Sequence, residues 1–104
     1  MLRVYGVMIE ALRGMRPIVA VIERKDSDLA RQIRRAASSV ALNIAEGSGS
    51  HGGNRTLRYR TALGSARETL ACLDVARAMH EIEIDPEIEG AVRLVSNTLR
   101  RVIR

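Results

Sequence analysis

The sequence contains no phenylalanine and no tryptophan, so Tyr5 and Tyr59 are its only aromatic residues. A hydrophobic core must therefore be built from leucine, isoleucine, valine, methionine and alanine, a set of side chains that favours closely packed helices. The scarcity of aromatic rings also removes the platforms on which proteins stack unpaired nucleotide bases. Cys72 is the single cysteine, which excludes an internal disulfide and a cysteine-based zinc site.

Long hydrophobic runs are missing as well. The apolar run at the start of the sequence, residues 4–9, is flanked by Arg3 and Glu10. This segment is too short and too charged for a membrane span or an export signal. We therefore expect a cytoplasmic protein without a membrane partner. The 104 residues have the length of one domain, which we place at residues 1–104.

Motifs that hold metals or nucleotides are absent from the sequence. A di-metal bundle needs paired Glu-x-x-His motifs, but Arg77 stands three residues before His80, and Ser48 stands three before His51. The glycine-rich segment 47–54 lacks the Gly-Lys-Ser/Thr ending and the preceding strand of a phosphate loop. These absences favour a protein that is not an enzyme, with no catalytic residues, no cofactor and no metal site.

Apolar residues recur in steps of three and four, which predicts four helices over residues 2–25, 28–46, 55–81 and 86–103. No strand pattern of any length is present. Because the links between the first and second and between the third and fourth helices are short, those neighbours should run antiparallel. The expected fold is an all-α, up-down-up-down antiparallel four-helix bundle.

Helix boundaries are marked by capping residues. Asp26, Asn54 and Asp85 are expected to cap the starts of the second, third and fourth helices, and Gly47 is expected to end the second. Pro17 lies inside the first helix, where it removes a backbone donor, and therefore predicts a bend.

The second predicted helix lacks charge where a solvent-exposed face should carry it. Its outward positions beyond the arginines are Ser38, Leu42 and Ala45, so a second copy of the chain is expected to cover them. A merely alanine-rich exposed helix is the alternative. Further residues expected to serve this interface or its packing are Asn43, Glu46, Gly47 and the mid-helix Gly64, whose use would be a close backbone approach.

Lysine is nearly absent, since Lys25 is the only one, and arginines gather in the middle of the chain. Between residues 31 and 67 there are seven arginines against Glu46 alone, whereas residues 80–89 hold five acids and no arginine or lysine. Guanidinium groups bind phosphates in bidentate fashion, so a nucleic-acid backbone is the expected ligand. The seven candidate contact residues are Arg31, Arg34, Arg35, Arg55, Arg58, Arg60 and Arg67. The alternative is that these arginines pair with acids of a neighbouring subunit.

Two segments of the sequence resemble a known family. Residues 32–50, QIRRAASSVALNIAEGSGS, and residues 62–70, ALGSARETL, resemble the signature of bacterial four-helix-bundle proteins encoded inside ribosomal-RNA intervening sequences. That family includes the accessory protein Avd of diversity-generating retroelements. The sequence departs from the family pattern at Leu57, Arg58 and Tyr59, where relatives often have phenylalanines, so partner identity does not transfer directly.

The resemblance implies a ring-shaped pentamer, because members of the family look like such rings. Avd looks like a basic pentamer that works with a reverse transcriptase on a structured RNA template. The partners to be expected are thus other copies of the chain, structured RNA or DNA, and a reverse transcriptase or another protein. Taken together, these features predict a non-enzymatic, oligomeric accessory protein that binds nucleic-acid backbone, with a homo-oligomeric protein-interaction scaffold as the alternative.

Overall fold

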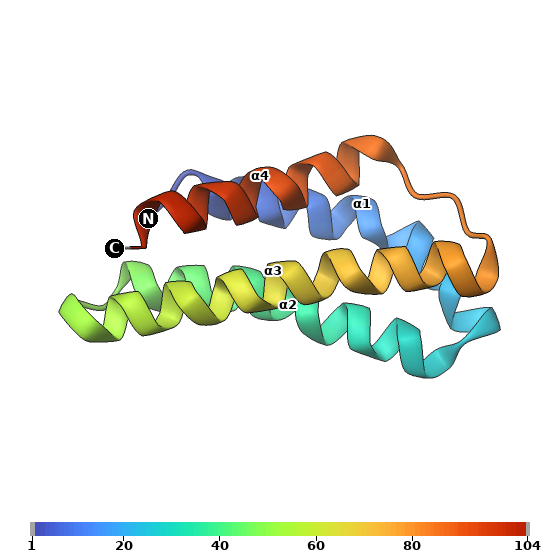
Figure 1. Cartoon of the computed structure of the whole chain (residues 1–104), viewed down its shortest axis with the longest axis horizontal. Coiled ribbons are helices and arrows are strands. Elements are labelled where there is room, and N and C mark those ends of the chain that lie inside the picture. The colour runs from blue at the N-terminus through green and yellow to red at the C-terminus, as the bar shows by residue number, and fades with distance from the viewer. Residues whose placement is uncertain (1, 104) are drawn as a thin grey trace.

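Four helices, α1 (Val4–Lys25), α2 (Ser27–Ser48), α3 (Gly52–His80) and α4 (Pro86–Val102), make up the computed structural model, which describes residues 2–103. Each helix packs against its neighbours around the bundle, in the order α1, α2, α3, α4 and back to α1, and α2 and α3 share the most extensive contact. The bundle is elongated, at 42 × 23 × 19 Å. The predicted all-α antiparallel four-helix bundle is confirmed (Figure 1).

Local capping fixes two of the helix starts as predicted. The Asp26 carboxylate accepts a hydrogen bond from the Leu29 backbone N–H at 3.0 Å, and Asp85 accepts one from the Glu87 N–H at 2.9 Å. Pro86 follows Asp85 at the first helical position, where its missing N–H costs nothing. Both predicted N-caps are therefore confirmed.

The link between α2 and α3 differs from expectation. Gly47 does not end α2, which continues to Ser48, because Gly47 is buried against the Tyr59 ring and serves helix packing instead. Asn54 does not cap α3 either. That helix begins at Gly52, three residues before the predicted start, and the Gly52 φ of +56° is a left-handed conformation that glycine adopts without strain. The connector is consequently shorter than the predicted glycine-rich segment.

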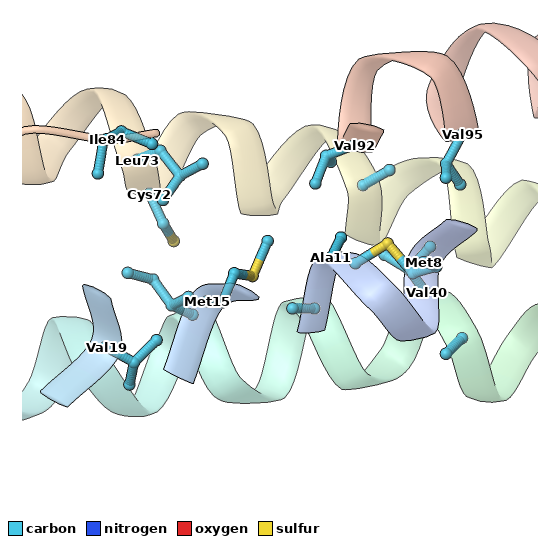
Figure 2. Close-up of a cluster of buried hydrophobic side chains, with 14 of the residues drawn as sticks. Met8, Ala11, Met15, Val19, Val40, Cys72, Leu73, Ile84, Val92 and Val95 are labelled. Carbon is cyan, nitrogen blue, oxygen red and sulfur yellow. The ribbon is translucent and has the colours of Figure 1, made fainter. Parts of the chain in front are cut away.

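The core is aliphatic, apart from Tyr59, which is 7% exposed. Helix α1 continues through Pro17 without interruption, and the bend expected there stays a prediction. Figure 2 shows side chains from all four helices and from the α3–α4 connection meeting in one cluster, among them Met8, Met15, Val40, Leu73, Ile84 and Val92. Among residues 2–103, no helix is long and apolar enough to cross a membrane.

One end of the bundle is held by a polar contact between distant segments. The second carboxylate oxygen of Asp26, Oδ2, lies 2.9 Å from Nε2 of His80, the last residue of α3. The hydrogen bond from His80 is the main cause that lowers the pKa of Asp26. Asp26 thereby joins the α1–α2 turn to the end of α3 while it caps α2.

Candidate nucleic-acid interface

All seven predicted contact arginines are exposed, and they are divided between two packed helices, α2 and α3. On α2, Arg31 pairs with Asp28 at 2.7 Å, and Arg34 pairs with Glu23 of α1 at 2.7 Å. These two guanidinium groups thus already have carboxylates beside them. Arg35 lines a groove of about 340 Å³ between α2 and α3, where Glu68 lies on the opposite wall.

The arginines of α3 are less engaged. Arg55 donates from Nε to the Ser50 carbonyl oxygen at 3.1 Å, and it lies with Arg58 in the first turns of the helix. Arg60 and Arg67 follow further along. Within residues 2–103, five of the seven arginines have no carboxylate oxygen within ion-pair distance, namely Arg35, Arg55, Arg58, Arg60 and Arg67.

A charged network crosses from α3 to α4. The Arg77 guanidinium binds both carboxylate oxygens of Glu89, and it also contacts Asp74 at 3.2 Å. Arg93 reaches the same Glu89 carboxylate at 3.2 Å. The hydrogen bond from Arg77 is the main cause that lowers the pKa of Glu89, and the same bond raises the pKa of Arg77.

Sequence reasoning did not select Arg93 and Arg100 of α4. They are seven residues apart, as are Arg60 and Arg67 on α3, so both pairs repeat at heptad spacing. That spacing was readable in the sequence. The two arginine pairs can form one surface only because α3 and α4 pack side by side, and this packing is known from the fold.

The outward face of α2 and α3 carries the apolar surface expected for the self-interface. Leu42 of α2 is 66% exposed and Leu57 of α3 is 60% exposed. Ser38 is exposed and Ala45 is half-buried, so the protomer itself leaves this face largely open. A leucine exposed on each of these two packed helices is apolar surface that an assembly would bury.

Polar groups on this face are satisfied within the protomer. The Asn43 amide donates to the Ser39 carbonyl oxygen at 2.9 Å and to the Ser39 hydroxyl at 3.0 Å, and Ser65 of α3 donates to the same hydroxyl at 2.8 Å. Asn43 therefore belongs to a hydrogen-bonded chain that joins α2 to α3. Glu46, expected to serve the interface or its packing, is exposed in the protomer and forms no ion pair within the described chain, so its role in an interface stays a prediction.

Gly47 and Gly64, both expected to serve packing, have different surroundings in the protomer. A Cβ added to Gly47 would lie 2.6 Å from Cδ1 of Tyr59, which is closer than real side chains approach. A Cβ added to Gly64 would meet no atom within 4 Å. Gly47 therefore makes a close approach inside the protomer, whereas the surface at Gly64 is open and the close approach expected there stays a prediction.

Cys72 and the acidic residues do not form a reactive centre. Cys72 is 5% exposed, and burial raises the pKa of its thiol, as expected of a core cysteine. Among residues 2–103, no three histidine, cysteine, aspartate or glutamate side chains are grouped so that they could hold a metal ion.

These features define a helical-bundle protein whose candidate sites are exposed helix surfaces. The chain belongs to the 23S rRNA-intervening sequence protein family, whose model matches residues 8–100. The family resemblance drawn from the two sequence segments is thereby confirmed. The chain matches none of the curated proteins.

A solved structure has the same fold. It is the crystal structure of a protein with unknown function from the S23 ribosomal protein family of Bacteroides thetaiotaomicron VPI-5482. The two chains are 20% identical and superpose with a TM-score of 0.84 over 97% of this chain and 98% of that chain. At this level of identity, the likeness demonstrates the fold.

Proposed function

We propose that this protein is a non-enzymatic accessory factor that binds the phosphodiester backbone of RNA or DNA and acts as an assembly of several copies. The observation that carries the nucleic-acid proposal is the set of five α2 and α3 arginines without carboxylate partners, in a chain of net charge +5. Free guanidinium groups attract polyanions and grip phosphate oxygens. Family membership supports the proposal, since the family is named for an intervening sequence of ribosomal RNA.

The absence of exposed aromatic platforms argues for contact with the backbone over recognition of bases. Tyr59 is buried, Tyr5 is half-buried against the core, and the sequence has no phenylalanine or tryptophan to stack on. Binding should consequently depend strongly on salt and weakly on base sequence. The protein would act in the cytoplasm, where a reverse transcriptase or another nucleic-acid enzyme is a candidate protein partner.

Self-association is supported by the open apolar face of α2 and α3. Leu42 and Leu57 remain exposed there, and Gly64 leaves room for close packing against another helix. A second copy of the chain would bury these side chains, and a closed ring of five copies is the assembly that we propose. The other candidate function is a protein-interaction scaffold, favoured by the acidic residues 81–89, which could meet a basic surface.

A salt titration separates the two functions. Binding of a fluorescein-labelled single-stranded RNA would be measured by anisotropy at increasing salt, and contact with Z phosphates gives a log-log slope of about −0.7Z. We expect saturable binding with a slope steeper than about −2, which corresponds to three or more phosphates. An assembled protein that shows no saturable RNA binding at moderate salt would support the scaffold instead.

A further inference from the structure

Arginines at matched heptad spacing line the two helices that form the α3–α4 face. Arg60, Arg67 and Asp74 succeed one another at seven-residue intervals on α3, and Asp74 contacts Arg77, which binds Glu89 of α4. Residues seven apart occupy the same flank of a helix. Arg60 and Arg67 therefore share one exposed flank of α3 with Asp74, next to the position from which Arg77 reaches α4.

The same reasoning places the arginines of α4. Arg93 shares the Glu89 carboxylate with Arg77, so residues 89 and 93 lie on the flank of α4 that faces α3. Residues 96 and 100 continue this flank in steps of three and four. Ser96 is buried, so it lies on the core side of this flank, and Arg100 is exposed, so it lies on the solvent side.

The antiparallel arrangement brings the two pairs alongside each other. The last turns of α4 lie beside the first half of α3 (Figure 1), so the two arginine pairs run along neighbouring stretches of helix in opposite chain directions. Seven helical residues rise by about 10 Å. These four guanidinium groups belong to two helices that pack against each other, and we call them the arginine ladder, defined as Arg60, Arg67, Arg93 and Arg100.

Acids are confined to one end of this surface. Asp74 and Glu89 lie at the end where α4 begins, and both are engaged by Arg77 or Arg93. Toward the other end, the exposed or half-buried α3 flank residues are Thr56, Leu63 and Leu70, and Asn97 is the exposed neighbour on α4. Within the described chain, Arg60, Arg67 and Arg100 have no carboxylate partner.

We propose that the arginine ladder is the surface on which the nucleic-acid backbone binds, with Arg60, Arg67 and Arg100 as the principal phosphate contacts. This inference rests on the function proposed above and assigns its contact surface. It moves the site away from Arg31 and Arg34, whose charges are already compensated by Asp28 and Glu23. The ladder belongs to α3 and α4, whereas Leu42, on which the proposed self-interface is centred, belongs to α2.

Matched double variants test this assignment. Arg60→Gln/Arg100→Gln removes two ladder charges, whereas Arg31→Gln/Arg34→Gln removes two charges from α2, so both proteins have the same net charge. We expect the ladder variant to bind labelled RNA about tenfold more weakly and to reduce the magnitude of the salt slope by about 1.4. The α2 variant should stay within about threefold of the unsubstituted protein. Circular dichroism melts of both variants confirm that the bundle is intact.

Each possible result decides a separate point. Equal losses in the two variants would mean that net charge alone attracts RNA, which overturns the ladder while leaving the proposed function standing. No saturable binding by the unsubstituted protein would remove the proposed function itself. If Arg60→Gln/Arg100→Gln dissociated the oligomer and left RNA affinity unchanged, the ladder would be a protein contact and the inference wrong. A DNA of the same sequence, run in parallel, distinguishes RNA from DNA as the natural ligand.

Discussion

Gly47 and Tyr59 show how one missing side chain can determine a helix pairing. The α2 backbone approaches the tyrosine ring so closely that even one added carbon would overlap it. The phenol oxygen of Tyr59 lies 3.5 Å from the Ser48 hydroxyl, which places the ring edge beside the end of α2. The close packing of α2 on α3 at this point therefore depends on Gly47 and on the ring of Tyr59.

We expect Gly47→Ala to destabilise the fold by about 1–3 kcal/mol, because the new methyl group must displace the Tyr59 ring or the α2 backbone. The matched control is Gly90→Ala in α4. That change places a methyl group in open space in an exposed stretch of helix and should stabilise the protomer by roughly 1 kcal/mol. Urea denaturation measures the free energy of unfolding of both variants. A Gly47→Ala variant as stable as the unsubstituted protein would contradict the close contact.

Residue-scale expectations succeeded where the cause is local. Asp26 and Asp85 cap the helices that follow them because a side-chain oxygen needs only the backbone two or three residues ahead. The role of Gly47 could not be predicted because it depends on Tyr59, which lies on a different helix. The ring reaches Gly47 only when α2 and α3 pack together. The capping role predicted for Asn54 was wrong because α3 already begins at Gly52, two residues before Asn54.

At the scale of elements, the α3–α4 pair is joined by the Glu89 carboxylate, which receives hydrogen bonds from one arginine on each helix. Arg77 lowers the pKa of Glu89 in the folded state, so the unfolded chain binds more protons as the pH falls. The stabilisation from this group is fully present above the unfolded pKa of about 4.3 and is lost as the pH falls through the lower, folded pKa.

Glu89→Gln should therefore lower the thermal midpoint at neutral pH, and the difference from the unsubstituted protein should shrink below about pH 4. Thermal melts followed by circular dichroism across this range provide the measurement. Glu87→Gln is a suitable control, because Glu87 is exposed and makes no ion pair within residues 2–103. A difference that stays constant with pH would show that the Glu89 charge is not what stabilises the pair.

Helix number, type and direction could be predicted because apolar spacing and short links are written directly in the chain. The candidate site could be predicted only in part. Arg60 and Arg67 were selected from their charge and spacing, but Arg100 was not, since it is 33 residues beyond Arg67 in the sequence. Glu23, the partner of Arg34, became evident only once α1 and α2 were packed, whereas the pairing of Arg31 with Asp28 is a local contact three residues apart within α2.

At the scale of the whole molecule, charge is divided between the two ends of the bundle. The end with the α1–α2 turn and the α3–α4 connection carries most of the acids, including Asp26, Asp28 and the acidic residues 81–89 (Figure 1). The opposite end gathers basic residues from separate parts of the chain, namely Arg3, Arg55, Arg58, Arg60, Arg100 and Arg101. A polyanion would be attracted to one end and repelled from the other.

Assembly is also a property of the whole molecule, and Leu42→Asp tests it. A carboxylate placed in a buried apolar interface loses its hydration without a partner, so we expect the variant to be monomeric. Leu94→Asp is the control, since Leu94 is 48% exposed on α4, away from the α2 face. Multi-angle light scattering measures both. An unsubstituted protein that is already monomeric would contradict the interface, as would an assembly that tolerates Leu42→Asp.

The burial of Tyr59 beside Gly47 also gives the molecule a built-in optical reporter. With no indole to absorb its emission, tyrosine fluorescence from this chain comes from two phenols alone. Replacing Tyr5 by phenylalanine would leave Tyr59 as a single emitter at the junction of α2 and α3. Its brightness and its access to a soluble quencher would then follow the loosening of that junction in real time, without any attached dye.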